Sequence, residues 1–361
     1  MQALDFALRT ARFLTSKRAL AGARGQGRAS LNAGLAGIAA YLAEVARVLD
    51  EPWALVAARR WLREARDAAA RGPDAFGTAI SRPRGADGSL LVGSAGLSWA
   101  TLAVADAAGE RAGRARALSA LERHVPDARP SGDLVLGRGA YAEAGRALLA
   151  FGDLTAGEAQ AARRLVRAGG DCALRHARGD LASESLYPVA HGVAGMLLVL
   201  AGSPAHARFA HRKVEELAGL ATRESSGLGS YPLGPGVPMG GFLGSWCNGV
   251  TGLLQLFVRA ARDKPSAVIE RALIDCALTT ARLRATVPSL CCGSAGRALF
   301  LLDVAELFGE AAFRRRASAL LASAMNQSRR EDLSLFYGQA GIAWVALIAA
   351  APAARRPVLF M

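Results

Sequence analysis

The sequence predicts an all-α protein, a toroid of seven repeated units in which each unit adds one inner and one outer helix. Three observations support this fold class. A Gly-x-x-Gly turn followed by an apolar helical run recurs along the chain, and amphipathic stretches with helical periodicity separate the turns. Alanine, leucine and arginine, which favour helices, are abundant. Units of this kind cannot bury their apolar faces alone, so they must stack, and seven are enough to close a ring.

The seven copies can be aligned on the first glycine of each turn. These glycines are Gly34, Gly93, Gly137, Gly192, Gly249, Gly293 and Gly338. Successive copies are 44–59 residues apart, which is enough for two helices and their connections. The third copy is the weakest, because Ala140 replaces its last glycine. We therefore expect roughly fourteen helices in a single domain that spans residues 1–361.

The stretches between the turns supply the outer helices, since their apolar residues recur at spacings of three and four. The clearest are residues 54–70, 114–124, 158–167 and 265–283. The turn glycines are expected to adopt unusual backbone angles and to permit close helix approach. In the first, second and seventh units, we expect packing to be the only role of the motif.

Two glycine- and proline-rich stretches interrupt the pattern, at residues 72–88 and 225–244. Both are predicted to be loops, and neither has the character of a domain boundary. The second precedes Cys247. It is therefore either a flexible lid beside a site or an insertion tolerated at the surface.

Composition and charge limit the classes of function. A hydrophobic content of 52% with 20% charged residues indicates a folded protein with a substantial core. The net charge of +14 is explained either by solvated arginine faces or by an acidic peptide partner. Nucleic acid is disfavoured, because the arginines are scattered and no nucleic-acid-binding motif accompanies them.

No apolar run of about 20 residues occurs, so a membrane span is not expected. The first 20 residues lack an apolar signal core, and we expect them to form a structural helix. The five cysteines are odd in number and two of them are adjacent, which does not suit a disulfide framework. A reducing cytoplasm is the expected location.

Three of the cysteines mark a candidate metal site. Cys291 and Cys292 immediately precede the turn of the sixth unit, and Cys247 stands at the matching place in the fifth unit. Zinc prefers a tetrahedral shell of thiolate and imidazole, and three protein ligands leave one position open for chemistry. Cys172 and Cys276 lie inside helical stretches and are expected to be ordinary core residues.

His191 and Asp133 are the candidate acid–base residues. His191 directly precedes the turn of the fourth unit, the position that Cys292 and Asn248 occupy in theirs. It is either a core histidine or a functional one, as a general acid/base or a fourth metal ligand. Asp133 precedes Gly137 by four residues and is either a turn residue or a partner for His191.

Three motifs in this order, His-Gly-Val-Ala-Gly, Trp-Cys-Asn-Gly-Val-Thr-Gly and Cys-Cys-Gly-Ser-Ala-Gly, resemble those of the lanthionine synthetase C-like cyclases. The resemblance covers essentially the whole chain. It implies an (α/α)7 barrel with zinc (Zn2+) at its mouth, with Cys247, Cys291 and Cys292 in the ligand positions. It also implies that His191 is the acid/base and that Asp133 is a functional aspartate.

Three positions depart from the family pattern. Cys292 stands where a histidine ligand is more frequent, which resembles the three-cysteine variant of some substrate-tolerant bifunctional lanthipeptide synthetases. Leu243 stands where several members carry arginine. Asn248 replaces a tyrosine or histidine found in many members.

The resemblance implies a zinc-dependent cyclase that adds peptide cysteine thiolates to dehydroalanine or dehydrobutyrine and forms thioether rings. A dehydrated precursor peptide is the expected substrate, bound through an acidic leader. The dehydratase is expected to be a separate protein, since the first repeat begins by Ser30. Two alternatives remain: a zinc enzyme that adds glutathione or another free thiol to dehydroamino acids in proteins, and a non-catalytic peptide-binding toroid. An unrelated barrel hydrolase would need paired acidic residues, and only Asp133 is in place.

Overall fold

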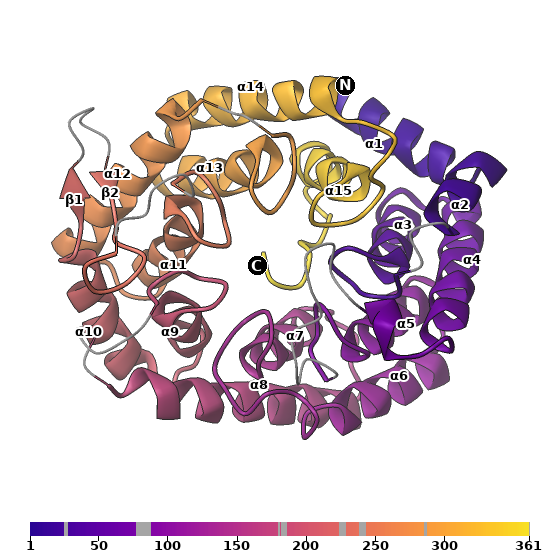
Figure 1. The fold of residues 1–361 in the computed structure, drawn as a ribbon, viewed down its shortest axis with the longest axis horizontal. Coiled ribbons are helices and arrows are strands. Elements are labelled where there is room, and N and C mark those ends of the chain that lie inside the picture. Colours follow the sequence, from indigo (N-terminus) through magenta and orange to yellow (C-terminus); the bar gives the residue numbers. More distant parts are fainter. Residues whose placement is uncertain are drawn as a thin grey trace.

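Each of the seven predicted turns opens an inner helix of a closed ring in the computed structural model (Figure 1). The structure describes residues 1–24, 28–76, 88–179, 181, 186–223, 229–237, 243–284 and 287–360. The inner helices are α3 (Leu35–Leu49), α5 (Ala95–Ala107), α7 (Gly139–Leu149), α9 (Val193–Ala201), α11 (Val250–Asp263), α13 (Ser294–Phe308) and α15 (Gln339–Ala350). The predicted all-α toroid is confirmed.

An outer layer of helices surrounds this ring (Figure 1). It consists of α1 (Gln2–Leu14), α4 (Pro52–Ala69), α6 (Arg111–Arg123), α8 (Ala156–Ala177), α10 (Ala207–Ala218), α12 (Ala267–Arg282) and α14 (Ala311–Gln327). The short helix α2 (Lys17–Arg24) is additional, so the described residues form fifteen α-helices rather than fourteen.

The first and last parts of the chain meet to close the ring. Helix α1 packs against α15 and therefore serves as the outer helix of the seventh unit. Two buried hydrogen bonds join α1 to the first unit: Tyr41 Oη donates to the carbonyl of Ala7 at 2.7 Å, and Trp61 Nε1 donates to that of Leu14 at 2.8 Å. The expected structural helix at the start of the chain is thus confirmed.

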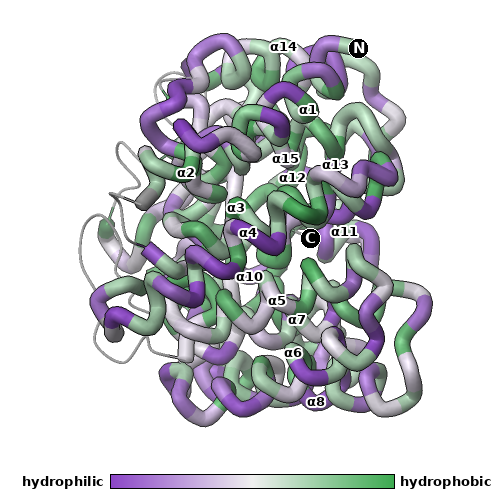
Figure 2. The backbone as a smooth tube through the Cα atoms, turned by 90° about the vertical axis from the view of Figure 1, so that its right-hand side faces the viewer, coloured by the Kyte–Doolittle hydropathy of each residue, from purple (hydrophilic) through white to green (hydrophobic). Residues whose placement is uncertain are grey.

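The two layers differ in sequence because they meet different surroundings. Inner helices touch two inner neighbours and an outer helix, so they are apolar nearly all round; in α3, residues 35–46 are all buried. Each outer helix buries one apolar face and carries arginines on the opposite face. Figure 2 shows this division, with polar stretches along outer helices such as α4 and α8. None of the described helices is long and apolar enough to cross a membrane.

The turn glycines are required by close packing and not by unusual backbone angles, which corrects that part of the sequence prediction. Gly249 and Gly293 precede their helices with φ of −121° and −126°, an extended conformation open to any residue. A Cβ atom on the second glycine, however, would lie 2.1 Å from the carbonyl oxygen of Trp246 at Gly252, and 1.9 Å from that of Leu335 at Gly341. The four residues before the first glycine of a unit, here called its lead, thus cross directly over the first turn of the inner helix that follows.

The two predicted loops are described only in part. Residues 77–87 of the first lie outside the described part of the chain, and its start forms the short 3-10 helix η1 (Pro73–Phe76). Just before the second, β1 (Thr222–Arg223) pairs antiparallel with β2 (Gly229–Ser230), which lies inside the predicted loop and next to α12. Residues 224–228 and 238–242 lie outside the described residues, so the lid remains a prediction.

The glycine packing predicts opposite effects for two glycine-to-alanine substitutions. Gly341→Ala places a methyl group against a backbone carbonyl and should lower the free energy of unfolding by about 2–3 kcal/mol. Gly157→Ala, in the exposed first turn of α8 with no atom within 4 Å of the new Cβ, should raise it by about 0.5 kcal/mol. Urea unfolding of both variants measures the difference, and equal stabilities would contradict this packing.

Candidate functional site

The leads of the seven units lie side by side at one end of the ring, joined by hydrogen bonds between neighbouring loops. The residue two before the first glycine carries most of these bonds. Ala190 N donates to the carbonyl of Cys247 at 3.0 Å, Cys291 N to that of Phe336 at 3.0 Å, and Phe336 N to that of Asn32 at 2.9 Å. These bonds hold the side chains of successive leads in register around the mouth of the ring.

This arrangement brings the three predicted metal ligands together. Cys247 Sγ lies 3.7 Å from Cys292 Sγ, and Cys292 Sγ lies 3.5 Å from Cys291 Sγ. All three sulfur atoms fall within 4.8 Å of one another. Cys291 is buried beneath the pair, Cys247 is half-buried and Cys292 is exposed. Among the described residues this is the one cluster of three or more potential ligands.

The thiol cluster fits a tetrahedral zinc ion. Zn–S bonds of about 2.3 Å at tetrahedral angles separate two sulfur ligands by roughly 3.8 Å, close to the two distances observed. The pKa shifts of the three thiols also fit a cation site. Hydrogen bonds from Cys291 and Cys292 lower the pKa of Cys247, whereas their interaction with Cys247 raises the pKa values of Cys291 and Cys292. Without a cation, one thiolate therefore uses the other two thiols as donors, and a divalent cation would allow all three to ionise.

His191 and Asp133 form a pair on the same rim. His191 Nδ1 donates to Asp133 Oδ2 at 2.9 Å, and this contact joins the leads of the third and fourth units. The carboxylate fixes the proton on Nδ1, so Nε2 is the nitrogen that can take up and release a proton. Asp133 is thus the partner of His191, one of its two interpretations from the sequence, and it is also a turn residue, which was the other.

The second carboxylate oxygen of Asp133 explains this double role. Asp133 Oδ1 accepts hydrogen bonds from the backbone N–H of Val135 and Leu136, at 2.6 and 2.7 Å. In other units a serine at the same position binds the equivalent N–H, as Ser289 Oγ does for Cys292 at 3.2 Å. A serine has a single oxygen for this contact and carries no charge. Aspartate shapes the turn with one oxygen and holds His191 with the other.

The pKa of His191 is raised above its ordinary value of 6.5. Burial is the largest influence and by itself lowers the pKa, but the hydrogen bond and the charge of Asp133, with the charge of Cys247, outweigh it. The imidazole side chain remains 36% exposed. The raised pKa favours the protonated imidazole, and the side chain is open to solvent.

Sequence reasoning missed one residue of this rim. Tyr337 directly precedes Gly338, so it holds in the seventh unit the position of His191 in the fourth and Cys292 in the sixth. The seventh turn was expected to serve packing alone. Burial, followed by the charges of the three thiols, raises the pKa of Tyr337, yet the side chain is 41% exposed. It is a protonated phenol beside the thiol cluster, and its place in the repeat was the signal that could have found it.

The comparisons with known proteins agree with this architecture. A family profile described as "Lanthionine synthetase C-like protein" matches residues 25–353. The chain belongs to this family. Among solved structures it is similar to nisin cyclase, with a TM-score of 0.67, 15% sequence identity and 89% of each chain covered. That likeness concerns the fold. The search of curated proteins found no match.

Four other positions were singled out by the sequence, and none of them belongs to the thiol cluster. Cys172 and Cys276 are buried, as predicted for core residues of this lanthionine synthetase C-like chain, and burial raises the pKa of both. Leu243 is also buried, and its carbonyl accepts from Val250 N at 2.9 Å. Asn248 is half-buried, and its backbone N–H donates to Ser245 Oγ at 3.2 Å.

The two functions of Asp133 can be separated by one substitution. Asp133→Ser restores the serine turn of other units and removes the partner of His191, so the ring should fold while the pKa of His191 falls, because burial then acts with less opposition. NMR titration of the imidazole measures this fall.

The same change should make stability depend differently on pH. Because the folded pKa of His191 is raised, the pair stabilises the fold fully below the unfolded pKa and loses that contribution as pH rises through the folded pKa. The deficit in melting temperature of Asp133→Ser should therefore be larger at about pH 5 than at about pH 9. An unchanged His191 pKa in the variant would refute the pairing.

Proposed function

We propose that this chain is a zinc-dependent cyclase that forms thioether rings in a dehydrated peptide. The observation that carries the proposal is the convergence of three thiols with a His–Asp pair on one exposed rim. Cys247, Cys291 and Cys292 are the proposed zinc ligands, and His191 with Asp133 is the proposed acid–base pair. Membership of the lanthionine synthetase C-like family supports this reaction class.

Zinc held by the three thiolates would act as a Lewis acid that lowers the pKa of a substrate thiol in the open fourth position. The reaction itself is an addition. The peptide sulfur bonds to the β-carbon of a dehydroalanine or dehydrobutyrine, and the carbon–carbon double bond becomes an enolate that must take a proton at its α-carbon. The thiol proton lost at the start balances the proton gained at the end.

His191 is the proposed donor of that proton. Its raised pKa favours the protonated form, and Asp133 holds Nδ1 so that Nε2 is the nitrogen that delivers the proton. Tyr337 is the proposed hydrogen-bond donor to the enolate oxygen, because its raised pKa keeps the phenol protonated beside the thiols. The two residues belong to the fourth and seventh units, on either side of the cysteine-bearing fifth and sixth.

A second candidate function keeps the same chemistry and changes the thiol. The exposed position of Cys292 would also admit a small free thiol such as glutathione, added to dehydroamino acids in proteins. In the cyclase, the substrate arrives already dehydrated, so a dehydration reaction must act first. A peptide-binding toroid without catalysis would use none of the proton-transfer groups on the rim.

Elemental analysis of the purified protein tests the metal site. We expect about one zinc ion per chain, lost in Cys291→Ala/Cys292→Ala because two of three ligands are gone. Cys172→Ala/Cys276→Ala is the matched control, since it removes two buried cysteines outside the cluster and should retain zinc. A folded wild-type protein that binds no zinc would leave the non-catalytic toroid as the better account.

Rates with two kinds of substrate test the reaction. His191→Asn should keep zinc and slow cyclisation of a dehydrated, cysteine-containing peptide by about 10²–10⁴-fold, and Tyr337→Phe by about 10²-fold. Wild-type protein should form rings faster than it adds glutathione to a cysteine-free dehydrated peptide, as mass spectrometry would show. The opposite preference would favour the free-thiol enzyme, and full activity of His191→Asn would remove that residue from the mechanism.

A further inference from the structure

The segment that follows α15 runs back through the centre of the ring toward the thiols. Every inner helix begins at the end where the leads lie, so α15 finishes at the opposite end, at Ala350. Residues 351–360, here called the lumen segment, lie in the centre of the ring (Figure 1). Phe360 reaches Trp246 and Phe336, which belong to the leads of the fifth and seventh units.

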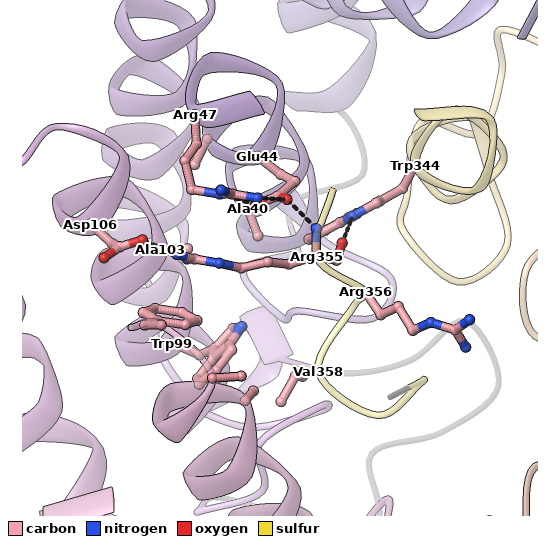
Figure 3. Close-up of a pocket in the computed structure, with 14 residues that line it drawn as sticks. Ala40, Glu44, Arg47, Trp99, Ala103, Asp106, Trp344, Arg355, Arg356 and Val358 are labelled. Atoms are coloured by element: carbon pink, nitrogen blue, oxygen red, sulfur yellow. Dashed lines mark hydrogen bonds and ion pairs between the residues drawn. The ribbon is translucent and has the colours of Figure 1, made fainter. Parts of the chain in front are cut away.

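Ion pairs fix the lumen segment at the end remote from the thiols. Arg355 contacts Asp106 of α5 at 2.6 Å, and Arg356 Nη1 contacts Asp303 of α13 at 2.6 Å. Trp344 Nε1 of α15 donates to the carbonyl of Arg355 at 2.8 Å (Figure 3). A cavity of about 260 Å³ remains between this part of the segment and the helices α3, α5 and α7. The segment is anchored here but does not fill the space.

Packing becomes tight at the thiol end. Phe360 is fully buried, with its ring centroid 4.6 Å from that of Trp246, 5.3 Å from that of Phe336 and 6.0 Å from that of Phe300. Aromatic pairs at these separations contribute beyond the area they bury. Phe360 therefore packs directly beneath the leads of the fifth and seventh units.

A chain of hydrogen bonds reinforces the same contact. Trp246 Nε1 donates to Gln255 Oε1 at 2.8 Å, and Gln255 Nε2 donates to the carbonyl of Leu359 at 2.9 Å. All of these groups are buried, so each bond also satisfies a polar atom that would otherwise lose its hydration. The lumen segment thus fixes the orientation of the Trp246 side chain.

The two supported leads are those that hold the cysteines in place. Trp246 is the residue before Cys247, and its backbone N–H donates to the carbonyl of Cys291 at 2.8 Å. Cys291 N in turn donates to the carbonyl of Phe336 at 3.0 Å. Cys291 therefore lies between two residues that stand directly on Phe360.

We propose that the lumen segment positions the thiol cluster for metal binding, with Phe360 and Leu359 as positioning residues that touch neither metal nor substrate. The inference rests on the zinc site of the proposed function. Groups that orient ligands without binding the metal typically change metal affinity by about 10–100-fold when removed. Loss of Phe360 should have an effect of this size, separate from any loss of global stability.

Cobalt binding to the full chain tests the proposal, because thiolate-to-cobalt absorption reports both affinity and ligand geometry. Phe360→Ala should bind Co²⁺ about 10–100-fold more weakly than wild type, with weaker charge-transfer absorption. Phe360→Leu should recover most of the affinity. The control is Phe257→Ala, which removes the same side chain from an equally buried place, against Tyr231. Melting temperatures of the metal-free proteins show how far each change affects the fold.

Each outcome decides the proposal. Selective weakening in Phe360→Ala supports it, whereas wild-type affinity in that variant, or equal weakening in Phe257→Ala, overturns it. If Phe360→Ala does not fold, Gln255→Met breaks the hydrogen-bonded link at similar volume. Weaker Co²⁺ binding in Gln255→Met then supports the proposal, and wild-type affinity overturns it. Wild-type protein that binds neither Co²⁺ nor Zn²⁺ would instead overturn the zinc site itself, and with it this inference.

Discussion

Hydrogen bonds between neighbouring leads, around the mouth of the ring, are the constraint on which the rest of the structure depends. In six of the seven units they connect backbone groups two or three residues before the turn, so they fix a common register that side chains cannot alter. Each lead also crosses over its own inner helix so closely that a carbonyl oxygen occupies the space of a Cβ atom at the second glycine. Together these contacts turn seven sequence repeats into one rim, on which equivalent positions of different units face the same space.

That register explains why the candidate site needs few special residues. Cys247 and Cys291 occupy one repeat position, and His191, Cys292 and Tyr337 occupy the next. Changing the residue at a shared position changes the chemistry and leaves the backbone unaffected. Asp133 is the clearest case, because its carboxylate retains the turn-forming contact made elsewhere by serine and adds a contact to His191.

The interior of the ring has a second, independent organisation. Alanine-rich inner helices approach closely and leave a lumen, which the residues after α15 enter (Figure 1). Salt bridges from Arg355 and Arg356 hold this segment to α5 and α13, and its apolar end lies under the leads of the fifth and seventh units, which both bond to Cys291. The rim is thus held laterally by its neighbours and from below by the lumen segment, which limits the freedom of thiols that a metal would have to gather.

The sequence by itself determined the helical repeats, the seven-unit ring and the cysteines at matching turns, because these depend on periodicity and on glycine spacing within each unit. It also placed His191 and Asp133 at equivalent turns and gave their contact as one of two interpretations of Asp133. Only the tertiary structure decided that α1 completes the seventh unit, that Tyr337 joins the thiols and that Phe360 supports them. The physical reason is that these contacts join residues far apart in the chain, through ring closure and lumen packing, and no local pattern encodes such distances.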